Sequence, residues 1–154
     1  MNKKNDPLIA KNKKATFDYE ILDSWEAGIQ LQWYETKSVR NKHVNLKWSY
    51  IVIINHELYV KGMHITALAS LPNRWSILTD AERKIFLHKK TIQFLISKIK
   101  EGGYTIIPLE LYFVGSLIKM RVWLAKWKKQ FQKKQVLKER TMQKEAQKAL
   151  KKFI

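Results

Sequence analysis

The chain has 154 residues, 45% of them hydrophobic, and its 30 Lys and Arg against 13 Asp and Glu give a formal net charge of +17. This length and composition predict one small domain with a buried core. The absence of cysteine excludes disulfides and cysteine-type zinc sites. Apolar runs are far shorter than the ~20 residues that cross a bilayer, and residues 1–14 are too polar for a secretory signal. We therefore expect a cytoplasmic protein with no membrane partner.

The positive charge is concentrated at the two ends of the chain. Residues 126–154 contain ten Lys and one Arg against two Glu, and residues 1–14 contain five Lys against one Asp. Each cation that contacts a phosphate releases a counterion, so this distribution is typical of a protein that binds a polyanion. We predict a disordered basic arm over residues 1–10, a folded body over 11–125 and a basic tail over 126–154.

The first predicted element of the body is a strand. Apolar and polar side chains alternate over residues 25–32, which is typical of a strand with one buried face and one solvent face. Glu26 and Gly28 share the solvent face. Residues 34–42 are rich in charge and lack Gly and Pro, so they are predicted to form a short helix.

A hairpin is predicted next, from residues 46–54 and 58–62. Its turn falls at Asn55-His56, because Asn tolerates the left-handed conformation, although His is not the Gly that a tight hairpin prefers. Periodicity is lost over residues 66–82, around Pro72-Asn73, which indicates a surface loop.

A second helix and a second hairpin follow. Apolar residues recur at i, i+3, i+4 and i+7 over residues 92–99, and Gly102-Gly103 provides a C-terminal stop. Residues 105–113 and 117–125 are predicted strands that turn at Gly115-Ser116. Pro108 cannot donate to a sheet, so it is expected at an edge or a bulge. In the last strand, one face would carry Ile118, Met120, Val122 and Leu124, and the other Lys119, Arg121 and Trp123.

The tail is predicted to be conditionally helical. It has no Gly or Pro and is rich in Lys, Gln, Glu and Ala, which gives it high helix propensity. Its apolar residues are too sparse to dock firmly on a core, so we expect a tail that is disordered when free and helical when bound to an acidic partner.

These elements together predict the fold class. Five or more short strands in successive hairpins, with two or three short helices, indicate a mainly β protein built as a small antiparallel barrel of the OB type. Such barrels commonly present one face to nucleic acid.

Seven segments occur in the order and spacing of a known family. They are KNKKA (11–15), WEAGIQL (25–31), ETKSVR (35–40), VNLKWSY (44–50), RKIFLHKKTI (83–92), GYTIIPLELYF (103–113) and LKER (137–140). Through them the chain resembles the SsrA-binding protein family, also called small protein B, over residues 9–140.

The resemblance implies an RNA-binding factor of trans-translation, the pathway of ribosome rescue. Members of the family bind the tRNA-like domain of transfer-messenger RNA and deliver it to ribosomes stalled on messages without a usable stop codon. The implied partners are this RNA, elongation factor Tu through the RNA, and the decoding region and mRNA channel of the small subunit. The body would be an OB-type barrel that acts as a monomer, and the tail would become helical in the empty mRNA channel.

The resemblance also places candidate binding residues, position by position. The RNA-facing Asn, Glu and Leu of the family fall on Asn12, Glu26 and Phe86. A carboxylate such as Glu26 accepts hydrogen bonds from base edges or 2′-hydroxyl groups, and Gly28 beside it would let the backbone approach closely. Phosphate contacts are expected from Lys13, Lys14, Lys89, Lys90, Lys119 and Arg121, and base stacking from Trp123. Ribosome contacts in the tail are expected from Lys128, Lys129, Phe131, Lys133, Lys134, Lys138 and Arg140.

Plainer interpretations stand beside these assignments. An exposed carboxylate such as Glu26 is usually only solvated, and a tryptophan such as Trp123 more often packs in a core than stacks on a base. Phe86, between two apolar neighbours, fits the core as well as it fits RNA. The alternative functions are a ribosomal or general single-strand-binding OB protein and, from another class, an RNA-modifying or cleaving enzyme. The sequence has no paired carboxylates at positions typical of a catalytic site, no Gly-rich phosphate loop and no nucleophile with an evident base. Its four His lack ligand spacing, so we expect no catalysis, metal or cofactor.

The sequence also departs from the family pattern. Trp33-Tyr34 stands where relatives usually have Gly-Thr, and Trp48 stands where an Asp is usual. In the tail, Trp127 replaces a Gly, Phe131 keeps a ring without its polar tip, and Gln132 loses a carboxylate. RNA binding through charge should survive these changes better than accurate engagement of the decoding centre.

Overall fold

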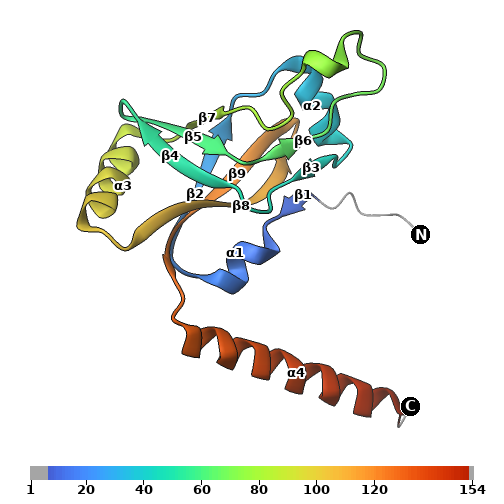
Figure 1. The fold of residues 1–154 in the computed structure, drawn as a ribbon, viewed down its shortest axis with the longest axis vertical. Helices are drawn as coiled ribbons and strands as arrows, with labels where there is room; N and C mark the ends of the chain where they lie inside the picture. Colours follow the sequence, from blue (N-terminus) through green and yellow to red (C-terminus); the bar gives the residue numbers. More distant parts are fainter. Residues whose placement is uncertain (1–6, 153–154) are drawn as a thin grey trace.

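The computed structural model describes residues 7–152, without the side chains of residues 130–132 (Figure 1). Its strands are β1 (Leu8–Lys11), β2 (Tyr19–Ile29), β3 (Val44–Asn45), β4 (Tyr50–Ile54), β5 (Glu57–Lys61), β6 (His64–Ile65), β7 (Arg83–Phe86), β8 (Tyr104–Val114) and β9 (Leu117–Trp127). Its helices are α1 (Lys13–Asp18), α2 (Trp33–Arg40), α3 (Lys89–Glu101) and α4 (Gln130–Lys152), with a 3₁₀ turn, η1 (Arg74–Ser76).

The strands form a closed antiparallel barrel. The main sheet runs β1-β8-β4-β5-β7-β2-β9, and β9 also pairs with β8, so that the strands from β8 to β9 close into a ring. Strand β1 also pairs with β8, at residues 110–112, farther along the strand than the pairing of β4 at Ile106, and β3 and β6 form a separate two-stranded sheet. The mainly β fold predicted from the sequence is confirmed, and the closed ring is consistent with an OB-type barrel.

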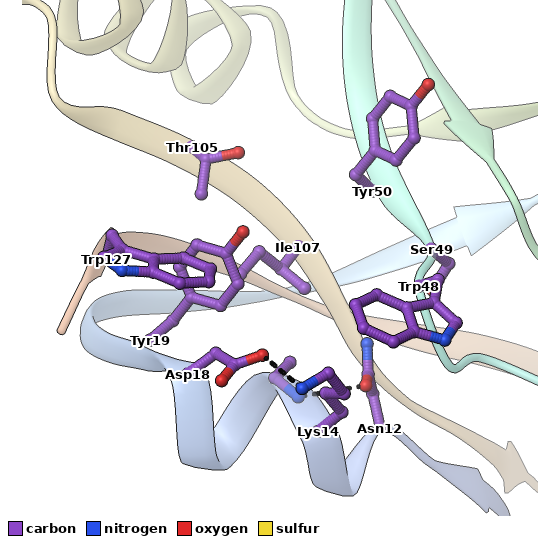
Figure 2. Close-up of a pocket in the computed structure, with 11 residues that line it drawn as sticks. Asn12, Lys14, Asp18, Tyr19, Trp48, Ser49, Tyr50, Thr105, Ile107 and Trp127 are labelled. Carbon is purple, nitrogen blue, oxygen red and sulfur yellow. Dashed lines mark hydrogen bonds and ion pairs between the residues drawn. The ribbon is translucent and has the colours of Figure 1, made fainter. Parts of the chain in front are cut away.

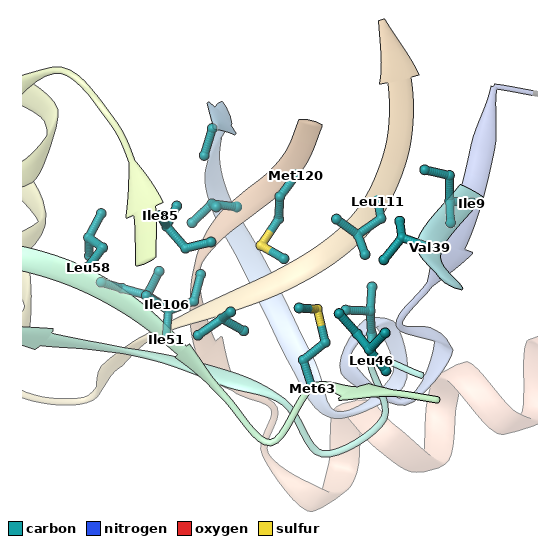
Figure 3. Packing of buried hydrophobic residues seen from close by; sticks show 14 of the residues in the cluster. Ile9, Val39, Leu46, Ile51, Leu58, Met63, Ile85, Ile106, Leu111 and Met120 are labelled. Atoms are coloured by element: carbon teal, nitrogen blue, oxygen red, sulfur yellow. The ribbon is translucent and has the colours of Figure 1, made fainter. Parts of the chain in front are cut away.

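The core fills the inside of this ring. Figure 3 shows side chains converging from successive strands, and each of them is at most 5% exposed: Ile51, Leu58, Ile85, Ile106 and Met120. Burial of each such side chain stabilises the fold by about 1.5–3 kcal/mol. Because alternate residues of each strand point inward, the residues between them are left for the outer face.

The predicted strand over residues 25–32 is confirmed up to Ile29, where β2 ends, and it starts earlier than its pattern. Strand β2 begins at Tyr19 and carries an irregularity between Ile21 and Asp23, where it pairs with β9. Ala27 is 1% exposed in the core, while Glu26 beside it is exposed, as the alternation predicts. The predicted helix over 34–42 is present as α2.

The predicted hairpin is present with a shorter first strand. Asn55 and His56 both have positive φ, 51° and 62°, which matches the twist of a two-residue turn between β4 and β5. Residues 46–49 do not belong to β4. They form a turn in which Trp48 has a φ of 66°.

Strand β7 was not predicted, and α3 begins before its apolar period. Arg83 is 4% exposed, so a charged side chain occupies an inward position of β7 and breaks the alternation that marks a strand. Helix α3 starts at Lys89 and ends at Glu101, and the φ of 82° at the following Gly102 supports the predicted glycine stop. Residues 66–82 form the predicted loop, interrupted by η1.

The last hairpin follows its prediction closely. Strands β8 and β9 turn at Gly115-Ser116, and the register between them shifts between Pro108 and Glu110. Pro108 therefore lies at a bulge, one of the two places predicted for it. Met120, Val122 and Leu124 face the core as expected.

The N-terminal arm predicted over residues 1–10 needs a correction. Residues 8–11 form β1, which pairs with β8, and Ile9 is 6% exposed in the core. The apolar residues 8–10 are stabilised by hydrogen bonds to the unpaired edge of β8 and by burial of their side chains. This stabilisation orders the segment although the residues around it are polar. Residues 1–6 lie outside the described part of the chain.

The prediction that the tail is disordered when free is also corrected. Helix α4 spans 23 residues in the chain alone, and it leads away below α1 in Figure 1. The absence of Gly and Pro supports this helix, and its first turns rest on α1 as described below. No helix within residues 7–152 has the length and apolar character that a bilayer crossing needs.

Candidate nucleic-acid interface

The outer face of neighbouring strands collects five of the eleven predicted RNA-binding residues. Strands β7, β2, β9 and β8 lie next to one another in the ring, and their pairing sets which outward residues are neighbours. The pairs across this face are Phe86 with Gly28, Glu26 with Arg121, Gly28 with Lys119, and Lys119 with Tyr112. We call this surface the strand face.

Glu26 is held in a fixed position on the strand face. The Tyr112 hydroxyl donates a 2.6 Å hydrogen bond to Glu26 Oε2. Partial burial of the Tyr112 ring, followed by this hydrogen bond and the charge of Glu26, raises the pKa of Tyr112 to about 12. Tyr112 uses one carboxylate oxygen, which leaves Glu26 Oε1 available to accept a hydrogen bond from a ligand.

The cation beside Glu26 is positioned by a second acid and by the same ring. Arg121 Nε lies 3.7 Å from Glu110 Oε2, and the guanidinium carbon lies 5.4 Å from the centre of the Tyr112 ring. The partners orient Arg121 but leave it partly exposed, with 40% of its side-chain surface accessible. The strand face therefore offers an acceptor and an oriented cation side by side.

Phe86 lies over Gly28 on the same face. A Cβ atom added to Gly28 would come 3.4 Å from Phe86 Cβ, an ordinary van der Waals contact, so the Phe86 side chain lies directly beside this glycine. Gly28 thus lies in contact range of Phe86, and its expected role, close approach of RNA to the backbone, stays a prediction. Phe86 itself is 49% exposed, which rules out the core as its place and leaves its ring available to a ligand.

The remaining cations predicted for this face surround it. Lys119 lies half-buried on β9, next to Tyr112. Lys89 and Lys90 are exposed in the first turn of α3, directly after β7. Lys84, which the sequence did not single out, lies with its ammonium 5.5 Å from the Phe86 ring.

Two predicted RNA contacts are buried instead. Asn12 is 3% exposed, its amide oxygen accepts from Ala15 N at 3.1 Å, and its amide nitrogen donates to Pro108 O at 3.1 Å. Trp123 is 9% exposed, paired across the sheet with Ser24 and Ile107. Asn12 thus caps α1 and ties it to the β8 bulge, and Trp123 packs rather than stacks.

Helix α1 lies on the outside of the barrel and lines a pocket there. Ala15 packs against Ile107 and Ala125 on the outside of the barrel, so α1 covers this end of β8 and β9. The pocket has a volume of about 220 Å³ and is drawn in Figure 2. Trp48 and Trp127, two of the departures from the family pattern, line it from opposite sides. Lys13 is exposed on α1, and Lys14 reaches toward Trp48 with its ammonium 4.7 Å from the ring centre.

Asp18 connects α1 to the tail. Its side chain is 7% exposed and lies 3.1 Å from Lys14 Nζ and 3.4 Å from Lys133 Nζ. Its backbone oxygen accepts from Lys128 N at 2.8 Å, and Lys128 Nζ donates to Thr16 O at 3.1 Å.

Further along α4, one more cation rests on the body. The Arg140 guanidinium lies 5.6 Å from the centre of the Phe17 ring on α1. Three predicted ribosome contacts, Lys128, Lys133 and Arg140, thus hold the tail against α1. Lys129, Lys134 and Lys138 are exposed, and the side chain of Phe131 lies outside the described part of the chain.

Sequence reasoning missed Tyr112, Asp18 and the pocket formed with Trp48 and Trp127. One signal for Tyr112 was present, because a two-residue turn at Gly115-Ser116 sets it opposite Lys119. Asp18 and the pocket depend on how the bulged β2 brings α1 onto the barrel, and no local pattern encodes that. Within residues 7–152, no group of three or more His, Asp or Glu could hold a metal ion.

Comparisons with known proteins agree over almost the whole chain. The family model described as SmpB protein matches residues 9–152. An SsrA-binding protein of Nitratiruptor sp. is 44% identical over 147 residues, which cover 95% of this chain and 98% of that protein. One from Listeria welshimeri is 42% identical over 98% of this chain and 97% of its own length. A solved structure described as "tmRNA-SmpB: a journey to the center of the bacterial ribosome" has a TM-score of 0.65 and 34% identity, covering 81% of this chain and 87% of that one.

Proposed function

Because this chain belongs to the SmpB family of SsrA-binding proteins, we propose that it binds transfer-messenger RNA and serves in trans-translation on stalled ribosomes. The observation that carries this proposal is the match over residues 9–152, which includes both the barrel and α4. We place this activity in the cytoplasm, with the protein acting as a non-enzymatic monomer and meeting elongation factor Tu only through the RNA.

In this proposal the strand face binds the tRNA-like domain of the RNA. Glu26 accepts hydrogen bonds from a base edge or a 2′-hydroxyl group, while Lys119, Arg121, Lys89 and Lys90 bind phosphates. Tyr112 supports this role, because its hydroxyl fixes Glu26 before the RNA arrives and reduces the entropy lost on binding.

The tail would bind the ribosome. Helix α4 carries a dense set of cations, and a row of lysines and arginine on a helix suits a channel lined with RNA phosphates. We propose that α4 occupies the mRNA channel near the decoding region, with Lys134 and Lys138 among its contacts because they are exposed.

A competition experiment tests the RNA assignment. Labelled transfer-messenger RNA bound to the full chain should be displaced far more effectively by the same RNA, unlabelled, than by equal masses of ribosomal or transfer RNA. Equal displacement by all of them would leave a general RNA-binding barrel and remove the specific assignment.

The Glu26→Gln substitution tests the strand face, because the direction in which RNA affinity changes distinguishes two roles of Glu26. If Glu26 accepts hydrogen bonds from RNA, affinity should fall about 10- to 150-fold, because hydrogen bonds to charged groups contribute about 1.5–3 kcal/mol. If Glu26 is only solvated, removal of a negative charge should strengthen binding. Glu101→Gln is the matched control, since it makes the same change of charge at the exposed C-terminal end of α3, away from the strand face, and should not weaken binding.

Removal of residues 128–154 tests the division between body and tail. The shortened protein should retain most of its affinity for transfer-messenger RNA but fail to support peptide tagging on stalled ribosomes. Tagging by the shortened protein would refute the proposed role of α4.

A further inference from the structure

Trp48 is an exposed tryptophan in a strained backbone conformation. It is 68% exposed, and its φ of 66° is rare for a bulky residue. The turn is braced from below, because a Cβ atom on Gly62 would come 3.0 Å from the Trp48 carbonyl oxygen. A rigid turn that holds a large ring in solvent does nothing for the core, and such strain is characteristic of functional sites.

Trp127 faces the same pocket from the other side and is also fixed in orientation. It is 59% exposed, and it meets Tyr19 edge to face at 5.1 Å with an interplanar angle of 89°. In Figure 2, Ile107 lies between the two tryptophans and forms the apolar floor. A volume of about 220 Å³ is below the 300–1,000 Å³ of typical sites for drug-sized ligands, so the pocket suits one planar ring system.

Cations surround both indole rings. Lys14 and Lys47 place their ammonium groups 4.7 and 5.8 Å from the centre of the Trp48 ring, and Lys133 lies 3.6 Å from the centre of the Trp127 ring. Aromatic rings interleaved with lysines are the arrangement by which proteins bind single-stranded nucleic acid, with bases on the rings and phosphates on the cations.

The buried polar groups of the pocket are already used within the protein. The Asn12 amide caps α1 and binds Pro108 O, and the Asp18 carboxylate holds Lys14 and Lys133. A base entering here would therefore be recognised by its flat face more than by its edge, which makes the site tolerant of base identity.

We propose that this pocket binds one unpaired base of an RNA, stacked on Trp48 and Trp127, with the adjoining phosphates on the surrounding lysines. The inference rests on the RNA binding of the proposed function and adds a second contact, apart from the strand face. The two surfaces are close, because Ala125 beneath α1 lies four residues along β9 from Arg121, a distance of about 13 Å. One RNA can therefore engage both.

Alanine substitutions of single tryptophans in the full chain test the proposal. Trp48→Ala and Trp127→Ala should each weaken binding of transfer-messenger RNA about 5- to 150-fold, the range for loss of one base stack. Trp48→Tyr should restore most of the affinity, because it returns an aromatic face. Trp75→Ala is the matched control, since Trp75 is 85% exposed on the loop at η1 and does not line the pocket.

The salt dependence of binding distinguishes stacking from an indirect effect on the lysines. Loss of a base stack leaves the slope of log affinity against log salt unchanged, whereas loss of one phosphate contact reduces it by about one. The proposal is overturned if Trp48→Ala binds within twofold of the wild type, if its slope falls by about one, or if Trp75→Ala weakens binding equally. Circular dichroism melting confirms that each variant is folded.

Two further measurements complete the test. One asks whether the pocket binds a base of an RNA or a free nucleotide, and the other whether a failure concerns the pocket or the proposed function. In the first measurement, adenosine monophosphate is added to the wild type and tryptophan fluorescence is recorded. If the nucleotide quenches the fluorescence while Trp48→Ala leaves RNA affinity unchanged, the pocket binds a free nucleotide and the proposed RNA contact is overturned. If Glu26→Gln weakens binding but the tryptophan variants do not, only the pocket assignment fails. If the wild type shows no preference for transfer-messenger RNA, it is the proposed function that fails.

Discussion

The Asp18→Asn substitution should release α4 from the barrel while leaving both folded. Asp18 holds both Lys14 on α1 and Lys133 on the tail, at 3.1 and 3.4 Å. Asparagine keeps the size of the side chain and removes its charge. The backbone bond from Lys128 N to Asp18 O does not depend on the side chain and should persist.

The size of the effect follows from the geometry of the pair. At 3.4 Å and an effective dielectric constant of about 20, the attraction between Asp18 and Lys133 is about 5 kcal/mol before solvation is counted. Lost hydration and side-chain entropy offset most of this. Exposed pairs retain about 0.2–1 kcal/mol, and this pair is more sheltered, with side chains 7% and 19% exposed. We therefore expect a net loss of about 1–2 kcal/mol, or about 5- to 30-fold in the ratio of docked to released helix.

A distance measurement between two labels gives the readout. The sequence contains no cysteine, so cysteines introduced at the exposed positions His56 and Lys144 can be spin-labelled without background. The wild type should give one narrow distance distribution, and Asp18→Asn a broad one. Raised salt should broaden the wild-type distribution in the same way, since screening weakens the ion pairs.

Asp80→Asn provides the control for this measurement. It makes the same change of charge on the exposed loop after η1, far from α4 in the sequence, and should leave the distribution narrow. An equally narrow distribution for Asp18→Asn would refute the reasoning, because it would mean that packing and the contact of Arg140 with Phe17 hold the tail without the acid.

Two further predictions concern the barrel itself. Glu35→Ala should lower the free energy of unfolding, measured in urea, by about 3–5 kcal/mol, because it leaves the charged Arg83 side chain 4% exposed with only carbonyl partners. Glu57→Ala removes the exposed partner of Lys84 and is the control, since it should lower the free energy of unfolding by about 1 kcal/mol or less. The pKa of Tyr112 is raised from 10.0 to about 12, so its neutral form contributes stability that is fully present below pH 10 and is lost as the pH rises through about 12. Between these pH values the wild type should lose stability more steeply than Tyr112→Phe, and parallel curves would show that the Tyr112 environment is ordinary.

The parts of the fold with a clear period were predictable from sequence. The alternation in β2 and β9 and the 3.6-residue period in α3 each reflect one buried face, so a local pattern records the tertiary contact. Strand β7 was missed because Arg83 points inward, where it pairs with Glu35 and donates to Met63 O and Thr79 O. A buried ion pair looks like a polar surface in the sequence, since its partner is 48 residues away.

The candidate site was predictable in its residue types more than in its geometry. The resemblance predicted Glu26 and Phe86 as RNA contacts, and both lie on the strand face. It gave no warning that Asn12 is buried as a helix cap or that Trp123 is covered, because burial depends on where α1 settles on the barrel. The arrangement of Tyr112 and Glu26 spans 86 residues and follows only from the closure of the sheet.

The contacts that dock α4 also bear on how the tail could serve the ribosome. Lys133 and Arg140 are predicted ribosome contacts, yet in the chain alone they bind Asp18 and the Phe17 ring. Moving α4 into an RNA channel would break these contacts with α1, so docking on α1 and binding in the channel compete. Docking rests on a few contacts of about 0.5–2 kcal/mol each, whereas every cation of the tail that meets a phosphate adds affinity through counterion release. A weakly docked helix of this kind is compact when free and is released where phosphate density is high, so the tail need not be disordered beforehand to change partners on the ribosome.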